Sequence, residues 1–316
     1  MSGFLLLCVG VIYLGLDSEK ARRSEKYGKG IRIPEVSLFR GVYFYKAYEF
    51  KPSFILESNT LKITDNTYMD FETPKGIFYS KGVEYQYEGR TGFLNQKKEE
   101  LELKGDVRLS GKNFDYVSDK ISFVGPKSIF NAEGNVSSQI VDSKTLDLIK
   151  LKSEKLTSFI DKQITELTGN VRGSLKRKRI YEGGFRFSAS KVTVNSLESQ
   201  MNLSESVRIH RNNYYLRSGS AEIFMENYNK KLKYYSLYDD VKLEENLTLS
   251  SGEKQLRRAF AEKLEGVQST GEVILTGAPR VEQGNDTIKG YQITLRENIE
   301  LIEVDDAQSR FRVRKD

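Results

Sequence analysis

The side chains that most often carry catalysis or bind metals are scarce in this sequence. The 316 residues include one histidine, His210, and one cysteine, Cys8. One cysteine can form no intrachain disulfide and no cysteine-built metal site, and one histidine leaves one candidate for imidazole acid–base chemistry. His210 shares the parity of the charged residues around it, which predicts a solvated strand residue. No nucleophile elbow, phosphate-binding loop or metal-ligand cluster occurs, so we expect no catalytic residue, no metal, no cofactor and no enzyme.

Charge is a second possible source of binding chemistry. Fifty Lys and Arg residues against 44 Asp and Glu leave a net charge of +6, which favours an anionic partner such as nucleic acid, an anionic membrane or an anionic lipid. The densest basic run, Lys176-Arg177-Lys178-Arg179, is either an exposed hairpin tip or an anion contact. Nucleic-acid binding would need aromatic side chains interleaved with basic ones on an exposed face, whereas Phe185 and Phe187 share the parity of apolar residues. We therefore expect no nucleic-acid partner.

Apolar residues recur in a pattern that could bind a hydrophobic ligand. Leu103-Lys104-Gly105-Asp106 precedes Val107, and Leu167-Thr168-Gly169-Asn170 precedes Val171. Related segments precede Val136, Val207 and Val241, and Pro279 takes the place of the valine in the last one. A unit that returns every 30 to 40 residues or so predicts a stacked architecture in which no unit buries its apolar face alone.

Alternation within each unit predicts strands with one dry face. At the first unit the apolar parity holds Leu101, Leu103, Gly105, Val107 and Leu109, and the other parity holds Glu102, Lys104, Asp106 and Arg108. The glycines two places before the valine or proline are expected to face inward at corners of a folded-over sheet: Gly105, Gly134, Gly169 and Gly277. Glu205 and Asp239 replace this glycine in two units, which indicates either bulges or a wetter part of the interior.

Other segments complete the predicted organisation. Strand-like patterns begin at Val42, and only residues 253–267, with Leu256, Ala259, Phe260 and Leu264, have helical spacing. Residues 1–16 form an apolar segment that is shorter than a bilayer span, with basic residues after it. An uncleaved N-terminal membrane anchor, a cleaved signal and a soluble N-terminus are the three alternatives; the first is our expectation, with residues 17–40 as a charged linker.

The repeated Leu-x-Gly-x-Val strands, the N-terminal apolar segment and the closing Gly277-Ala278-Pro279-Arg280-Val281 with Gly290-Tyr291-Gln292-Ile293 resemble the periplasmic bridge proteins of lipopolysaccharide export, the LptA, LptC and OstA-like group. The resemblance implies an all-β fold, an elongated open β-jellyroll made of a two-layer, folded-over antiparallel sheet. It covers residues 41–316, with 41–165 LptC-like and 166–316 LptA/OstA-like. The body is longer than is usual for LptC, and the short anchor departs from that pattern.

The resemblance also implies a function: lipopolysaccharide transport across the periplasm of a Gram-negative envelope, with acyl chains bound in the groove. The implied partners are lipopolysaccharide, the inner-membrane ABC transporter complex, the membrane through the N-terminus, and an LptA-like or outer-membrane bridge protein that pairs with the terminal edge strand at Phe311 and Val313. The implied location is the inner membrane, single-pass, with a periplasmic domain. The alternative is a structural β-repeat protein of the surface or envelope without a lipid ligand.

The groove candidates share the inward parity of their strands, where plain core packing would give the same pattern. They are Leu101, Leu103, Val107, Leu109, Ile121, Phe123, Val136, Leu167, Val171, Phe185, Phe187, Leu203, Val207, Ile209, Leu237, Val241, Leu243, Leu275, Val281, Ile293 and Leu295.

Overall fold

The computed structural model describes twelve stretches of the chain. They are residues 35–48, 51–80, 83–112, 114–141, 148–178, 184–211, 213–226, 231–248, 252–267, 269–296, 302–306 and 308–310. The predicted anchor at 1–16 and the edge residues Phe311 and Val313 lie outside them. No helix in these stretches is long and apolar enough to cross a membrane.

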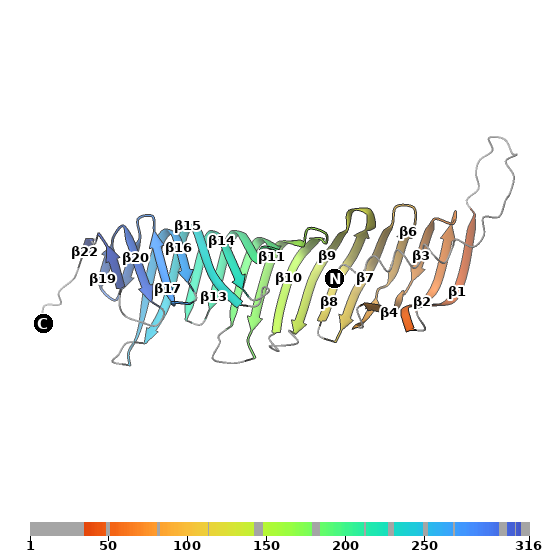
Figure 1. Cartoon of the computed structure of the whole chain (residues 1–316), viewed down its shortest axis with the longest axis horizontal. Helices are drawn as coiled ribbons and strands as arrows, with labels where there is room; N and C mark the ends of the chain where they lie inside the picture. Colours follow the sequence, from red (N-terminus) through yellow and green to blue (C-terminus); the bar gives the residue numbers. More distant parts are fainter. Residues whose placement is uncertain are drawn as a thin grey trace, which may run out of the picture. The chain divides into compact units, whose positions relative to one another are not determined.

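The chain divides into two compact units. Unit 1 comprises residues 1–143 and 154–162, and unit 2 comprises residues 144–153 and 163–316, so that strand β10 (Leu148–Phe159) contributes its two halves to different units. Figure 1 shows the strands of unit 1 from orange to yellow-green and those of unit 2 from green to blue.

Unit 1 is built from antiparallel strands. Besides its half of β10 it contains β1 (Val36–Tyr48), β2 (Lys51–Thr64), β3 (Tyr68–Glu72), β4 (Lys75–Ser80), β5 (Val83–Glu88), β6 (Thr91–Asn95), β7 (Glu100–Gly111), β8 (Phe114–Val124), the 3₁₀ turn η1 (Gly125–Lys127) and β9 (Ile129–Val141). The long strand β2 pairs with β3 along one half and with β4 along the other. β7 likewise pairs with β5 and β6 before the chain continues as the meander β7–β8–β9.

Unit 2 follows the same plan in the opposite order. Besides its half of β10 it contains β11 (Ile164–Lys176), β12 (Phe185–Asn195), β13 (Gln200–Arg211), β14 (Tyr214–Glu226), β15 (Lys231–Thr248), β16 (Lys254–Val267), β17 (Glu272–Thr276), β18 (Arg280–Gln283), β19 (Asp286–Lys289), β20 (Gln292–Arg296), β21 (Ile302–Asp305) and β22 (Gln308–Arg310). A meander runs from β11 to β16, and β16 then pairs with β17 along one half and with β18 along the other.

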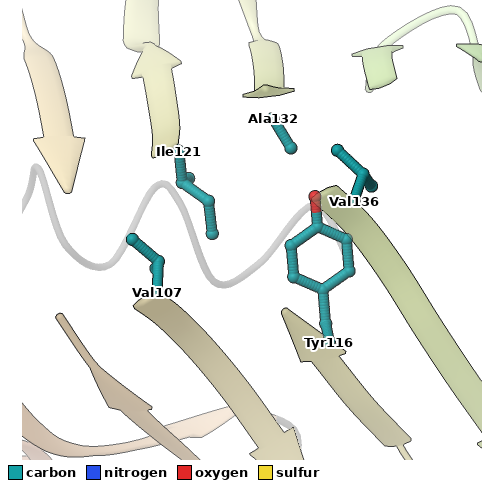
Figure 2. Close-up of a cluster of buried hydrophobic side chains, with 5 residues drawn as sticks. All are labelled: Val107, Tyr116, Ile121, Ala132 and Val136. Carbon is teal, nitrogen blue, oxygen red and sulfur yellow. The ribbon is translucent and has the colours of Figure 1, made fainter. Parts of the chain in front are cut away.

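Each long strand bends so that its two halves lie in different layers. In Figure 2, Tyr116 and Ile121 enter one buried cluster from opposite sides although both belong to β8. Val107, Ala132 and Val136 complete this cluster from β7 and β9. The predicted all-β, two-layer, folded-over antiparallel sheet is therefore confirmed, and within the described stretches the one helical element is the three-residue turn η1.

The bend is made by a bulge at every repeated segment. Both residues before the valine or proline have φ between 46° and 79°, in the left-handed region. Opposite four of these pairs the partner strand supplies one residue, so that each is a β-bulge. The pairs are Gly105/Asp106, Gly134/Asn135, Gly169/Asn170, Glu205/Ser206, Asp239/Asp240 and Gly277/Ala278.

The glycines of these bulges serve the backbone and do not face the core, which corrects our expectation. A Cβ atom on Gly105 would lie 2.8 Å from the side chain of Arg90, whose own side chain is 75% exposed. Glycine is favoured here because it adopts positive φ without steric cost. Glu205 and Asp239 occupy the same conformation, so bulges, the first of the two alternatives at these positions, are confirmed.

Strands opposite the bulges carry a second signal, which the sequence analysis missed. At the bend, two consecutive inward side chains of such a strand are three residues apart and not two. The spacing changes because the bulge gives the partner strand one extra residue, so inward and outward positions exchange beyond the bend. The first of the two is small: Ser118 before Ile121, Ala189 before Val192, Ser218 before Ala221, and Ala261 before Leu264. The hydroxyls of Ser118 and Ser218 donate to the carbonyl two residues later, at 3.2 and 2.8 Å.

Residues 253–267, whose apolar spacing resembled a helix, also form a strand. Lys254–Val267 is β16, and the residues with that spacing lie on both of its faces: Ala259 and Leu264 are buried, whereas Leu256 is exposed and Phe260 is half-buried. The charged linker expected at residues 17–40 also ends too late, because β1 begins at Val36.

Candidate functional site

The predicted groove residues lie on the inner faces of the two layers. Most are buried, while four are half-buried, namely Leu101, Leu103, Leu109 and Phe185. The lipid-binding role of the whole set stays a prediction. His210 is exposed on β13, which confirms that it is a solvated strand residue.

In unit 1 the inner face forms two clusters. The first, the β7–β9 cluster, is Val107, Tyr116, Ile121, Ala132 and Val136, and half-buried Leu103, Leu109, Phe130 and Leu156 pack against it. The Tyr116 and Phe130 rings meet edge to face at 6.1 Å. Burial raises the pKa of the Tyr116 phenol well above its usual value, with a smaller opposite effect from its hydrogen bond to Ser118. Tyr116 is therefore neutral and acts as part of an apolar wall.

The second cluster of unit 1 lies at the β2–β3–β6 end. Met69, Phe71 and Leu94 are buried there, and Leu56, Leu61, Ile63 and Leu101 pack against them while remaining half-buried. Leu101 on β7 therefore continues the apolar inner face from the β7–β9 cluster to this one. An apolar ligand would meet aliphatic and aromatic side chains along both.

In unit 2 the inner face becomes fully sealed toward the end of the chain. We call the following residues, each at most 1% exposed, the C-terminal core: Leu237, Val241, Leu243, Leu264, Leu275, Val281, Ile293 and Leu295. They come from both layers, since β17 and β20 pair with one another and β18 pairs with β19. In this conformation the space between the layers is filled by the protein's own side chains.

A buried ion pair lies on the inner face beside the C-terminal core. Glu245 on β15 and Arg257 on β16 are register partners with fully buried side chains, and the Arg257 Nε donates to Glu245 Oε2 at 3.0 Å. The Asn213 amide donates to the second carboxylate oxygen at 3.2 Å. Arg257 also donates to the carbonyl oxygen of Arg296, on the other layer, at 3.2 Å. This latch, Glu245–Arg257–Arg296, therefore joins the two layers.

The sequence analysis did not predict the latch, although a signal for it exists. Glu245 and Arg257 both have the inward parity of their strands, with Leu243, Leu247 and Ala259 as neighbours on that face. A charged residue at an inward position needs a partner of opposite charge, because an unpaired buried charge is costly. An acidic and a basic residue at inward positions of adjacent strands could therefore have indicated a buried ion pair.

The described residues show no arrangement typical of catalysis. They contain no group of three or more His, Cys, Asp or Glu side chains that could hold a metal ion. The one carboxyl group with a clear pKa shift, Glu102, is stabilised in its charged form: burial opposes this, but Lys104 and Lys120 together lower its pKa. The apolar inner face and the charged outer surface offer binding by apolar contact and by charge.

The family match found for this chain lies within unit 2. Residues 186–300 match the family described as LptA/(LptD N-terminal domain) LPS transport protein. The chain is also similar to LptH of Pseudomonas aeruginosa, described as the LptA-homologous periplasmic component of the lipopolysaccharide transport device, with 11% identity and a TM-score of 0.38 over 42% of this chain and 97% of that one. A comparison with curated proteins gives no match. The family match thus assigns LptA-like sequence to strands β12 to β20 of unit 2.

Proposed function

We propose that this chain acts in lipopolysaccharide transport as a periplasmic bridge component that binds acyl chains between its two layers. The observation that carries the proposal is the LptA-like match over residues 186–300, together with an inner face that stays apolar strand after strand in both units. The proposed location is the periplasm of a Gram-negative envelope. Anchoring of residues 1–16 in the inner membrane and an LptC-like role of the first part remain part of this proposal.

Apolar contact supplies the affinity in this proposal. Each acyl methylene that leaves water contributes roughly 0.8 kcal/mol, so several methylenes along the inner face would hold a chain firmly. The half-buried leucines Leu101, Leu103 and Leu109 of unit 1 are the side chains best placed to meet it first, because they are inward but still partly accessible. Outward positions beside them are charged, as at Lys104 and Arg108, which disfavours binding of an acyl chain to the outer face.

The proposed protein partners would contact strands in the first and the last part of the chain. β1 carries exposed Val36, Leu38, Phe39, Tyr43 and Tyr45, an unusual amount of apolar surface for one strand. We propose this strand as the contact for the inner-membrane transporter complex. A second proposal is that the terminal edge strand predicted at Phe311 and Val313, which lie outside the described stretches, pairs with an LptA-like or outer-membrane bridge protein.

Site-specific photo-crosslinking in cells tests lipid binding with adjacent matched positions. A photoreactive residue is placed at Leu103, Leu109 or Phe185 on the inner face, and at the outward neighbours Lys104, Arg108 or Arg186. Since successive residues of a strand point to opposite faces, the two members of each pair differ in the face they occupy and hardly in their position along the strand. We expect lipopolysaccharide to be captured from the inner positions and not from the outer ones.

Two outcomes would contradict the proposal. Equal capture from both members of each pair would show non-specific proximity to lipid. Absence of capture from all inner positions, with the variants folded, would favour the alternative of a structural β-repeat protein without a lipid ligand.

A further inference from the structure

The two outer faces of unit 2 differ in charge. One layer of unit 2 carries a row of outward residues in which each residue is the register partner of the next. The row crosses strands β11, β12, β13, β14, β15, β16, β18 and β19. We call it the basic row: Arg172, Ser188, Arg208, Arg217, Lys242, Phe260, Arg280 and Lys289. It holds six cations and no carboxylate.

The outer face of the other layer has the opposite character. A corresponding row crosses β11 to β17, β20 and β21, and we call it the acidic row: Glu166, Thr193, Asn202, Glu222, Ser236, Glu265, Ile274, Thr294 and Glu303. It holds four carboxylates and no cation. Unit 2 thus carries a row of cations on the outer face of one layer and a row of carboxylates on the outer face of the other.

The basic row is arranged at a cost to stability. Arg208 is directly opposite Arg217, and Arg217 is directly opposite Lys242. Like charges in directly opposed positions of a sheet destabilise it. All three are exposed, and within the described stretches none of the three has an ion-pair partner. A row of this kind is expected where an anionic surface supplies the missing negative charge.

Apolar groups lie among these cations on the same face. The Arg217 guanidinium is 4.9 Å from the centre of the Tyr215 ring, and that of Arg280 is 4.5 Å from the Phe260 ring. Leu256, on the outward parity of β16, is 39% exposed. Cations interleaved with aromatic and aliphatic groups suit the interface of a lipid bilayer, where charged headgroups adjoin apolar chains.

A cavity lies at one edge of this face, where the inward side chain of Phe185 also reaches its wall. The cavity, of about 610 Å³, is lined by Lys150, Lys176, Arg177, Arg186 and His210, with Leu148, Leu175 and Phe185 among the other lining residues. Arg186 and His210 are register partners on β12 and β13, two residues beyond Ser188 and Arg208 of the basic row. Among the described residues the lining holds basic, apolar and small polar groups and no acidic one, a composition that suits an anionic headgroup with its adjoining chains.

We propose that the basic outer face of unit 2 docks on the surface of an anionic lipid bilayer. The occupant is a membrane surface because the cations form a row across many strands and are mixed with outward apolar groups. Each Lys or Arg near such a surface strengthens binding about fivefold, and the attraction falls with salt. This inference does not require the interior to hold a lipid.

Vesicle co-sedimentation with the full-length protein tests the docking surface. The probe is vesicles of phosphatidylcholine alone or mixed with phosphatidylglycerol, which contain no lipopolysaccharide. We expect binding to the anionic vesicles only, lost in high salt. The triple variant Arg208→Gln, Arg217→Gln, Lys242→Gln should weaken it on the order of a hundredfold.

A matched control, the triple variant Lys155→Gln, Lys191→Gln, Lys263→Gln, removes three cations elsewhere and should change vesicle binding little. A second control, Arg208→Lys with Arg217→Lys, keeps the positive charges and should retain vesicle binding. Circular dichroism confirms that each variant is folded. Absence of binding to anionic vesicles at low salt, or equal weakening by both triple variants, would overturn the proposal. Loss of binding to a DNA duplex, with vesicle binding unchanged in the first triple variant, would overturn it in favour of a nucleic-acid surface.

Discussion

The β7–β9 cluster of unit 1 and the C-terminal core of unit 2 are built from the same repeated segment but differ in how tightly they are closed. Leu103 and Leu109 pack against the β7–β9 cluster while remaining half-buried, whereas Leu243, Leu275 and Ile293 of the C-terminal core are at most 1% exposed. The repeated segment therefore determines which side chains face inward, but not how exposed those side chains are. In unit 2 the latch joins the two layers beside the sealed core, and we expect it to contribute to the closure.

The largest expected effect concerns the latch. Arg257→Leu leaves Glu245 buried without its counter-charge and should lower the free energy of unfolding by about 3–5 kcal/mol. The double variant Glu245→Leu, Arg257→Leu removes both charges and should recover most of this loss. Urea unfolding followed by circular dichroism measures both. If the two variants are equally unstable, the latch is not a closed charge pair and does not explain the sealing of unit 2.

Truncating one leucine in each region sharpens the same comparison. Leu243→Ala in the C-terminal core should cost about 2–5 kcal/mol, because a sealed site keeps the cavity. Leu109→Ala, at a half-buried site of unit 1, should cost about 1 kcal/mol, since it loses less buried area. Denaturant titrations of the two variants give the difference directly. Equal losses would show that the interior of unit 1 is as closely packed as that of unit 2.

The smallest expected effect is the loss of stability when a bulge glycine is replaced. It should be similar in both units, because the bulges have the same backbone conformation. Gly105→Ala in unit 1 and Gly277→Ala in unit 2 each force a Cβ into a left-handed conformation and should cost roughly 1–2 kcal/mol. The reverse change, Asp239→Gly, should stabilise by up to about 1 kcal/mol. Thermal unfolding measures all three. A loss confined to Gly277→Ala would mean that the corners, and not only the interiors, differ between the units.

The sequence was informative about the strands and less so about their bends. Strict alternation around Val107 identified the inner face because a strand places alternate side chains on one side. Opposite a bulge the alternation shifts, so the consecutive inward residues Ala261 and Leu264 are three positions apart, and this spacing follows from the bulge in the partner strand. A parity change caused by a neighbouring strand cannot be read from one strand alone.

The candidate site was predictable in its apolar part only. Inward leucines and valines follow from local pattern, whereas the latch and the basic row depend on which residues of different strands are in register. Arg208, Arg217 and Lys242 are far apart in the sequence and alike only in their outward parity. Their alignment requires the bulges and hairpins that set each strand's register.

The meander from β11 to β16 has a consequence for how the chain reaches this structure. Each of these strands pairs with the strands that immediately precede and follow it. Pairing between neighbours in sequence closes short loops, so the entropic barrier to each step is small and folding can proceed hairpin by hairpin from a growing or emerging chain. Only at β16, whose later half must wait for β17 and whose earlier half for β18, does assembly depend on segments that follow.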